Sequence, residues 1–386
     1  MKITHIHIER FRGFQNEDFE VGSLLTAIAG QNGTQKSTLL GIITQTFTLK
    51  TEDSMRVEKP LCGGSYISAF KDKFRLSPTF DKPKGHEWTI SFDAGMDDFT
   101  VESIKRTGDP NVRFWKKGAR QEGDGYISFP TIFLSLKRLV PVAEEAKIIT
   151  DDTLLTQEEL NEFKQLHNKI LIAQTPISSA TTITSKNKQS IGVSTELYDW
   201  NQNSMGQDNL GKIILALFSF KRLHDKYPRQ YKGGILAIDE MDATMYPASQ
   251  VELLKILRKY ASKLNLRILF TTHSMSLLKA MDDLVQEVTK KEETANQAKI
   301  LYLKKVDDKI AIKQGVNFKG IQLDLNVVAE GNNRKKNRIT AYTEDKENIL
   351  FVKAILKSKA FVLDFVDVTL PCSTLMELVT KRVPAF

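Results

Sequence analysis

The sequence Ala29-Gly30-Gln31-Asn32-Gly33-Thr34-Gln35-Lys36-Ser37-Thr38 lies between an apolar run at residues 24–28 and a helical pattern that continues to about residue 47. An apolar strand, a glycine-containing loop and a helix in this order are typical of a phosphate-binding loop. Glycines let the backbone bend tightly, so that successive N–H groups converge on phosphate oxygens at a helix start, where the helix dipole favours anions. We therefore predict that this loop binds a nucleotide.

The side chains of the loop predict ATP and Mg²⁺ as cofactors. Lys36 is expected to reach the β- and γ-phosphates, and the Ser37 hydroxyl to ligate Mg²⁺. Gln35 stands where a glycine normally precedes the lysine, and because its side chain crowds the loop, we expect ATP to be held but hydrolysed slowly. A Gly/Asn turn with a chance Lys-Ser is the alternative. The predicted nucleotide contacts here are Gly30, Gln31, Asn32, Gly33, Thr34, Gln35, Lys36, Ser37 and Thr38.

Two later apolar strands end in residues suited to phosphate chemistry. Residues 233–238 lead into Asp239 and Glu240, and paired acids at the end of a buried strand need a cation nearby. Asp239 is expected to hold the Mg²⁺ water shell, and Glu240 to act as general base toward the attacking water. Residues 266–272 end at His273, which is expected to bond the γ-phosphate. Each strand end also suits an ordinary cap on the next helix.

A further stretch, Asn203-Ser204-Met205-Gly206-Gln207-Asp208, precedes apolar residues at helical spacing. Ser204, Gly206 and Gln207 offer hydroxyl, backbone and amide donors at a helix start, where a phosphate binds readily. Taken alone, the stretch is better explained by Ser204 or Asp208 as the N-cap of a core helix.

Composition and charge restrict the class of protein. The chain has 386 residues, 41% of them hydrophobic, which exceeds one ordinary domain and is ample for a core. It contains no apolar run near the roughly 20 residues of a membrane span, and no signal peptide precedes the first strand, so we expect a soluble cytoplasmic protein. The formal charge of +8 permits nucleic-acid contact, but its even spread favours a solvated basic surface. Cys62 and Cys372 lack metal-site spacing, and His5 and His7 are expected to be structural.

Short strands are predicted in the N-terminal third. Residues 2–9 alternate apolar and polar side chains at period two, and residues 86–95 and 98–106 have the pattern of a hairpin. Residues 131–136 form a further short β-rich run. These strands predict a β-rich lobe beside the strand that precedes the phosphate loop.

The middle of the chain predicts helices and one loop. Residues 156–172 and 248–263 have helical spacing of apolar side chains. The Ser/Thr/Lys-rich residues 174–192 are expected to form a mobile loop. The insert between Pro141 and Ser204 is short and its helices lack sustained heptads, which excludes a long coiled-coil arm.

Taken together and in this order, the four chemical stretches resemble the motifs of an ABC-type ATPase of the SMC/Rad50/OLD-like branch. Residues 30–37 match its Walker A motif, residues 204–207 its signature motif, residues 235–240 its Walker B motif, and His273 its switch histidine. The opening Ile8-Glu9-Arg10-Phe11-Arg12-Gly13-Phe14 is similar to the first strand of that branch, where a basic residue near Arg12 approaches the nucleotide. The resemblance implies an α/β P-loop ATPase head over residues 1–330, with a β-rich lobe and a short helical insert.

The loop Gly-Gln-Asn-Gly-Thr-Gln-Lys-Ser resembles more narrowly the PtuA family, the ATPase subunits of Septu antiphage systems, including those joined to retrons. This resemblance implies an ATP-dependent switch subunit that controls a partner HNH-type nuclease (PtuB-like). It also implies a homodimer or higher homo-oligomer through the ATPase heads, in which the signature helix of one copy completes the nucleotide site of the other. A retron reverse transcriptase with its DNA or RNA product is a further implied partner.

The tail, residues 331–386, predicts a small βαβ appendix. Basic, polar residues 331–337 are typical of a linker or a phosphate-facing loop, and strands are expected at 338–343 and 360–368 on either side of a helix at 347–357.

This order, with Glu344 at the tip of the first strand, resembles the start of a TOPRIM domain, as in OLD-type nucleases. Such a domain carries further metal-binding acids after an additional strand, and these do not appear before Phe386. Only a partial TOPRIM-like fragment is therefore expected, and a βαβ cap with surface acids remains equally open. Two alternative functions also remain open: an OLD-like ATP-dependent nuclease with its own TOPRIM domain, and a RecF-like DNA-repair ATPase.

Overall fold

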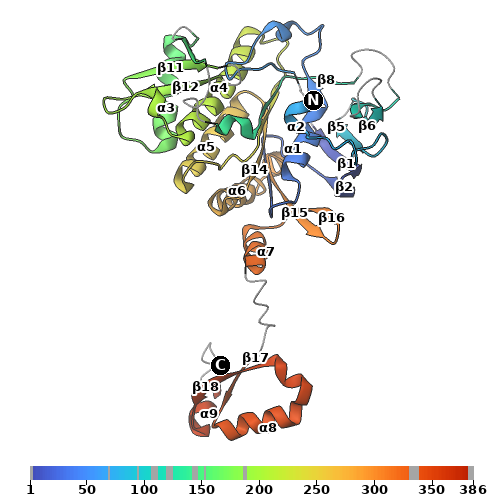
Figure 1. The fold of residues 1–386 in the computed structure, drawn as a ribbon, viewed down its shortest axis with the longest axis vertical. Helices are drawn as coiled ribbons and strands as arrows, with labels where there is room; N and C mark the ends of the chain where they lie inside the picture. Colours follow the sequence, from blue (N-terminus) through green and yellow to red (C-terminus); the bar gives the residue numbers. More distant parts are fainter. Residues whose placement is uncertain are drawn as a thin grey trace. The chain divides into compact units, whose positions relative to one another are not determined.

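A computed structural model describes residues 3–67, 70–93, 95–105, 112–118, 125–140, 147–151, 154–185, 189–329 and 339–380. The chain divides into two compact units, Met1–Gln322 and Leu323–Phe386 (Figure 1). Among the described helices, none combines the length and the apolar character that crossing a membrane requires.

Unit 1 is built around a six-stranded sheet that carries the loop at residues 30–37. Five of its strands run parallel, and the edge strand β16 pairs antiparallel with β15. The carboxyl ends of parallel strands share one edge of a sheet, which is where open α/β sheets bind ligands. The strand order is β16 (Lys309–Gln314), β15 (Ala298–Val306), β3 (Leu25–Gly30), β14 (Leu266–Thr272), β13 (Gly234–Ile238) and β9 (Thr131–Leu134).

A five-stranded antiparallel sheet forms the β-rich lobe. The predicted hairpin is confirmed, because Trp88 on β5 pairs with Val101 on β6, and alternate residues of β5 are buried, as expected for a strand with one face on the core. The strand at residues 2–9 is also confirmed and extends to Phe11. The order is β2 (Phe14–Phe19), β1 (Ile3–Phe11), β5 (Glu87–Phe92), β6 (Phe99–Lys105) and β7 (Val112–Lys116).

Helix α1 (Lys36–Gln45) packs in the core shared by the two sheets. Its side chains Leu39 and Ile43 are fully buried in one cluster with Ile8 and Trp88 of the antiparallel sheet and Ile235 of the parallel sheet. Burying an apolar side chain of this size contributes roughly 1.5–3 kcal/mol. This packing holds the first turn of α1, and hence Lys36, at the edge of the parallel sheet.

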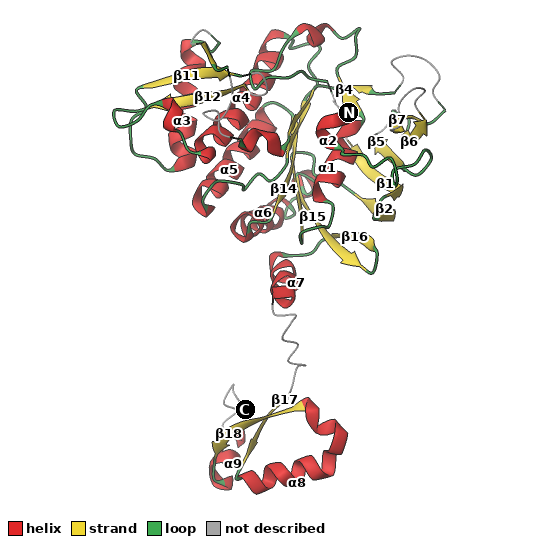
Figure 2. Cartoon of the chain, in the orientation of Figure 1, coloured by secondary structure: helices red, strands yellow, loops and turns green. Residues whose placement is uncertain are grey.

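Helices α3 to α6 cover the opposite face of the parallel sheet, whereas α2 (Phe70–Lys73) lies beside α1 (Figure 2). Helices α5 and α6 contact each other and pack on β14 and β15, and α3 packs on α4 and α5. The helices predicted at residues 156–172 and 248–263 are confirmed as α3 and α5. The bounds are α3 (Gln157–Leu171), α4 (Met205–Lys226), α5 (Pro247–Lys263) and α6 (Met275–Val288).

The prediction of a mobile loop at residues 174–192 is wrong. Strands β11 (Ser179–Thr184) and β12 (Gln189–Ser194) pair antiparallel, with Thr182 opposite Ile191, and residues 186–188 lie outside the described part. Polar composition suggested a loop, but Ile191 and Val193 are buried and β12 packs on α4. Burial against α4 therefore stabilises this hairpin. Strand β10 (Ile149–Asp151) also pairs with β11, so the insert is a helix plus a three-stranded sheet, rather than purely helical.

Smaller elements complete unit 1. The β-rich run at residues 131–136 is shorter than predicted, because the chain leaves β9 after Leu134 and enters a 3₁₀ turn. The remaining elements are β4 (Phe47–Thr48), η1 (Ser54–Val57), α2 (Phe70–Lys73), β8 (Ile127–Ser128), η2 (Leu136–Leu139), β10 (Ile149–Asp151), η4 (Trp200–Gln202) and η5 (Glu292–Thr294). Helix α7 (Phe318–Ala329) spans the boundary between the two units.

Unit 2 has the predicted βαβ order. Strands β17 (Ile339–Thr343) and β18 (Leu363–Thr369) pair parallel, and α8 (Lys346–Leu356) and η6 (Lys357–Val362) connect them. Helix α9 (Cys372–Thr380) follows. Glu344 comes directly after β17, as expected, whereas the proposed linker at residues 331–337 lies outside the described part. The resemblance of this unit to a TOPRIM domain stays a prediction.

Candidate nucleotide-binding site

The loop between β3 and α1 is a tight turn in which two glycines adopt positive φ angles. Gly30 has φ +152° and Gly33 has φ +80°. A Cβ on Gly30 would lie 2.5 Å from the Leu303 carbonyl oxygen, so a side chain has no room there. Thr34 closes the loop, because its hydroxyl donates to the Gln31 carbonyl at 2.8 Å. The loop thus passes directly into the amino end of α1, where backbone N–H groups have no partner within the helix.

Lys36 turns back over the loop. Its Nζ donates to the carbonyls of Gly30 (3.1 Å) and Gln31 (2.9 Å), and only 7% of the residue is exposed. Burial lowers the pKa of Lys36 to about 8, against three carboxylates that favour its charged form. These carboxylates are Glu240, Asp239 and Asp242.

Gln35 has an unusual backbone conformation. It precedes α1 with φ +62° and ψ +33°, the left-handed region that favours glycine, and its side chain does not cap the helix. The amide lies against Gly13 in the turn between β1 and β2, since a Cβ on Gly13 would be 2.8 Å from Gln35 Nε2. Gln35 Oε1 is buried and has no hydrogen-bond partner within the described residues.

A hydrogen-bond network joins the loop to the strand end at Asp239. The Ser37 hydroxyl donates to Asp239 Oδ1 at 2.8 Å, and the Thr271 hydroxyl donates to the same oxygen at 2.7 Å. Thr271 Oγ1 also accepts the Glu240 backbone N–H at 2.6 Å. Residues of α1, β13 and β14 therefore meet at the carboxyl edge of the sheet, as the parallel strands predict.

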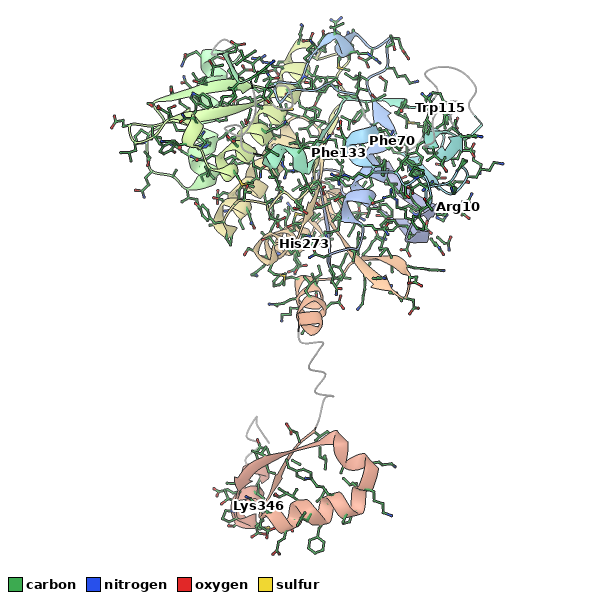
Figure 3. The ribbon with its side chains drawn as sticks, viewed as in Figure 1. Arg10, Phe70, Trp115, Phe133, His273 and Lys346 are labelled. Atoms are coloured by element: carbon green, nitrogen blue, oxygen red, sulfur yellow. The ribbon has the colours of Figure 1, made fainter. Side chains whose placement is uncertain are left out.

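Acidic residues and His273 surround Lys36. Glu240 has φ +50°, which turns the chain sharply after β13. Asp242 Oδ1 is buried without a partner among the described residues, while its Oδ2 accepts the His273 backbone N–H at 3.4 Å. His273 follows β14 (Figure 3), and its pKa is lowered, first by burial and then by the charge of Lys36. The structure thus brings Lys36, Ser37, Asp239, Glu240 and His273 into one electrostatic cluster.

The buried acid Asp81 holds Arg12 beside Thr38, in the first turn of α1. Its guanidinium makes two bonds to Asp81, Nε to Oδ1 at 3.1 Å and Nη2 to Oδ2 at 3.0 Å. Nη1 donates to Thr38 Oγ1 at 3.5 Å. His86 supports Asp81 from the other side, with Nε2 3.0 Å from Oδ1. Arg12 therefore lies next to the phosphate loop while remaining paired with Asp81.

The stretch at the start of α4 forms an N-cap, the alternative considered above. Ser204 Oγ accepts the Gln207 backbone N–H at 3.3 Å, and Gln207 Oε1 accepts the Ser204 backbone N–H at 2.9 Å, a capping box. Within the described residues, no hydrogen bond joins Ser204, Gly206 or Gln207 to residues 30–38. Gly206 lies instead against the turn after β13, because a Cβ there would be 2.5 Å from the Thr244 carbonyl oxygen.

The donor set fits a magnesium nucleotide. Three carboxylates face Lys36 and Arg138, which still leaves an excess of negative charge that a divalent cation can offset. The described residues contain no cluster of three or more His, Cys, Asp or Glu side chains able to hold a metal by itself. Mg²⁺ commonly takes only one or two protein carboxylates and completes its shell with phosphates and water. Ser37 and Asp239 match that requirement.

Several residues of the site have no local sequence signal. Thr271 and Asp242 belong to the network around Asp239, and Arg138 donates from Nη2 to the Glu240 carbonyl at 2.7 Å, across 102 residues of sequence. Asp242 follows the predicted Asp239-Glu240 pair closely, and its acid could have been included on that ground. Arg138 and Thr271 become recognisable only when their strands lie side by side.

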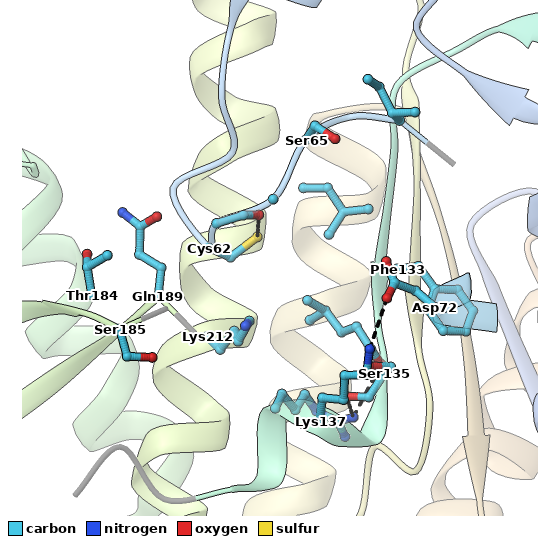
Figure 4. Close-up of a pocket in the computed structure, with 16 residues that line it drawn as sticks. Cys62, Ser65, Asp72, Phe133, Ser135, Lys137, Thr184, Ser185, Gln189 and Lys212 are labelled. Carbon is cyan, nitrogen blue, oxygen red and sulfur yellow. Dashed lines mark hydrogen bonds and ion pairs between the residues drawn. The ribbon is translucent and has the colours of Figure 1, made fainter. Parts of the chain in front are cut away.

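A cavity of about 440 Å³ lies beside the carboxyl end of β9 (Figure 4). Its lining includes Ser135, Lys137, Arg138 and Lys212, and none of residues 30–38. Lys137 pairs with Asp72 at 3.2 Å on its wall. The cavity is therefore separate from the phosphate loop, and Arg138 and Leu134 line it while also bonding to the Glu240 carbonyl and the Asp239 N–H, respectively.

Comparison with known proteins gives one family match. Residues 135–278, just over a third of the chain, match the AAA ATPase domain family. This segment includes Asp239, Glu240 and His273, so the family match supports ATPase activity. No curated protein matches the sequence of the chain.

Solved structures with similar folds are SMC head domains. The SMC head domain from Thermotoga maritima has 14% sequence identity and a TM-score of 0.44, with 82% of this chain and 100% of that chain covered. An Smc head bound to the C-winged helix domain of ScpA has 14% identity and a TM-score of 0.49, with 83% and 100% covered. An Smc head from Pyrococcus furiosus, with an extended coiled coil and bound to the C-terminal domain of ScpA, has 13% identity and a TM-score of 0.45, with 85% and 99% covered.

Proposed function

We propose that this chain is an ATP-binding and slowly hydrolysing switch subunit of the ABC type. The observation that supports this most is the 2.8 Å hydrogen bond between Ser37 and Asp239, residues 202 positions apart. It places the Ser37 hydroxyl, directly after the loop lysine, against Asp239 at the end of β13, two strands along the sheet from β3. P-loop ATPases hold Mg²⁺ between a hydroxyl and an acid of these two kinds.

Each residue of the cluster has a role on this proposal. Lys36 exchanges its bonds to two loop carbonyls for bonds to phosphate oxygens, and Ser37 and Asp239 hold Mg²⁺, which offsets the phosphate charge when bound. Glu240 accepts the proton of the attacking water, and His273 hydrogen-bonds the terminal phosphate. Thr271 holds Asp239 and the Glu240 backbone in place, so that the acids do not reorganise during the reaction.

The function further includes assembly of two copies through their ATPase heads. Ser204 and Gln207 cap α4 in their own chain, and among the described residues neither they nor Gly206 bonds to residues 30–38. The resemblance of residues 204–207 to the signature motif is what supports a role at the site of a second copy. From the resemblance of residues 30–37 to PtuA, we propose that the assembly acts in antiphage defence and controls a partner HNH-type nuclease (PtuB-like). A retron reverse transcriptase and its nucleic-acid product are proposed as further partners.

Two substitutions test the nucleotide site. Lys36→Ala removes the charge that contacts two phosphates, so we expect ATP binding to be lost in calorimetry. Glu240→Gln preserves shape but removes the base, so we expect ATP to be retained while turnover falls about 100-fold or more. Lys137→Ala is the control, because this lysine is exposed, with 74% of its side chain accessible, and lies outside the loop. Equal ATP binding by the wild type and Lys36→Ala would falsify the assignment.

An OLD-like nuclease is the second candidate, and unit 2 is the observation that favours it. Its parallel β17–α8–β18 arrangement, with Glu344 after β17, matches the start of a TOPRIM domain. Asp345 is already used as the N-cap of α8, where its Oδ1 accepts the Asn348 N–H at 2.7 Å. A nuclease of this kind would cut nucleic acid by itself with a divalent metal.

A further inference from the structure

We propose that Arg138 and Asn209 are positioning residues that couple the start of α4 to the general base Glu240. This inference rests on the ATPase function proposed above. It adds that the position of α4 sets the orientation of Glu240. Binding of a nucleotide or a second copy at Ser204 to Gln207 would then move the turn that carries Glu240 through Arg138 and Asn209.

Arg138 is a buried arginine, and each of its three guanidinium nitrogens donates a hydrogen bond. Only 2% of the residue is exposed. Its Nε donates to Asn209 Oδ1 at 2.7 Å, and Nη1 donates to the carbonyls of Leu134 (3.3 Å) and Ser135 (3.1 Å), which fixes the guanidinium on the end of β9. Nη2 donates to the Glu240 carbonyl at 2.7 Å. One planar group therefore binds β9, α4 and the acidic turn together.

Asn209 completes the link from the α4 side. It is fully buried, and while its Oδ1 accepts from Arg138, its Nδ2 donates to the Ala243 carbonyl at 3.0 Å. Gly206, one turn earlier on α4, lies against the carbonyl of Thr244. The first two turns of α4 thus contact the turn directly at two places, through Gly206 and Asn209, and indirectly through Arg138 of η2. A shift of the helix start has to move the turn with it.

The contacts act on the part of Glu240 that decides where its carboxylate points. The Glu240 backbone N–H is held by Thr271 and its carbonyl by Arg138. Its φ of +50° is a conformation that a non-glycine residue keeps only when its surroundings impose it. Bonds on both sides of the Glu240 Cα impose it here. Loss of the bond to Arg138 leaves the carbonyl held only by the Ala243 N–H of the same turn, at 3.1 Å, so the turn is no longer tied to β9 and the Glu240 side chain leaves its catalytic direction.

Arg138 also lies near three acids, and simple charge compensation is a competing role. Burial lowers the pKa of Arg138 to about 10, whereas Asp239, Glu240 and Asp242 favour its charged form. A lysine at position 138 could compensate the charge of the acids, but it could not position Glu240. Arg138→Lys keeps the positive charge but loses the planar fork that reaches two partners at once.

The test separates catalysis from binding. We expect Arg138→Lys to lower kcat about tenfold or more while the ATP dissociation constant changes by less than about twofold, because the phosphate contacts are untouched. Asn209→Asp keeps the shape and the acceptor for Arg138 but loses the donor to Ala243, so we expect a similar fall in kcat in a folded protein. The double variant should lose no more than the worse single variant, because both residues serve one link.

Arg267→Lys is the matched control. Arg267 is another buried arginine, 6% exposed, on β14 of the same sheet, and burial also lowers its pKa to about 10. We expect this substitution to lower thermal stability without changing kcat. An unchanged kcat in both Arg138→Lys and Asn209→Asp, additive losses in the double variant, or an equal loss of kcat in Arg267→Lys would each overturn the inference. Failure of the proposed function looks different, because wild-type protein would then not bind ATP through Lys36 at all.

Discussion

At the scale of single residues, Gln35 determines how the phosphate loop meets its helix. A left-handed backbone costs a non-glycine residue roughly 1–2 kcal/mol, and Gln35 adopts it directly before Lys36. The side chain is accommodated because Gly13 leaves room for it. Because the side chain has this space, we expect the left-handed backbone of Gln35, rather than the bulk of its side chain, to slow the site.

Gln35→Gly separates this effect from ATP binding. We expect turnover to rise several-fold because glycine adopts the left-handed conformation without strain, while ATP affinity stays within about threefold of the wild type. Steady-state phosphate release and calorimetry measure the two quantities.

Gln35→Ala serves as its control. Alanine keeps a Cβ in the left-handed region but removes the amide, so its turnover should stay near that of the wild type. Faster turnover in both variants would assign the slow step to the amide and contradict the backbone explanation.

At the scale of elements, one side chain at the amino end of α4, that of Ser204, has two roles on the proposed function. Ser204 caps the helix in its own chain, and on the proposed function its hydroxyl also contacts the nucleotide of a second copy. A cap contributes about 1 kcal/mol, so loss of activity in a simple alanine variant does not distinguish the roles. Aspartate does, because it is a good N-cap but has no hydroxyl donor and repels phosphate.

We expect Ser204→Asp to keep the melting temperature of the wild type and to lose ATP-driven dimerisation and turnover. Ser204→Ala should lose both the cap and the activity. Thr156→Ala is the matched control, because Thr156 makes the equivalent capping box on α3 far along the sequence from the signature stretch. It should destabilise the protein by about 1 kcal/mol with turnover unchanged. Light scattering with ATP measures the dimer, and normal dimerisation of Ser204→Asp would refute contact across the two heads.

At the scale of the whole molecule, the nucleotide site belongs to one unit. All residues of the site, from Arg12 to His273, lie in Met1–Gln322, whereas Glu344 lies in Leu323–Phe386. We further propose that ATP held in unit 1 keeps the assembly inactive and that falling ATP releases the partner nuclease. A slow site suits such a switch better than a motor.

The purified chain should therefore show no metal-dependent cleavage of DNA or RNA. Cleavage is expected only with the HNH-type partner, and added ATP should suppress it. The measurement is nuclease activity of the chain alone and of the complex over a range of ATP concentrations. Cleavage by the chain alone that is lost in Glu344→Ala but kept in Lys36→Ala would favour the OLD-like candidate. A partner that requires added ATP to cut, or wild-type turnover of tens per second as in ordinary enzymes, would contradict the resident-nucleotide switch.

Most of the fold could be read from local patterns, and the hairpin β11–β12 shows where they fail. The period-two alternation of β5 and β6 and the apolar spacing of α3 and α5 report burial within a few residues, and the structure confirms these elements. Thr182 and Ser190 are polar and suggested a loop, yet both are buried, because β12 packs on α4. The helix that covers this hairpin lies outside residues 174–192, and Ser190 bonds to Asp208 of α4, 18 positions later. The composition of the segment alone therefore could not predict the hairpin.

The sequence by itself determined the strand, loop and helix around Lys36, the acids after β13 and the histidine after β14. Each of these is a local signal, since glycine conformations, strand periodicity and paired carboxylates at a strand end leave their mark within about ten residues. Only the tertiary structure decided how these groups are held. Arg138 reaches Glu240 across 102 residues, and Thr271 reaches Asp239 across 32. Parallel strands place such residues side by side through long crossovers, so no local pattern records the contact.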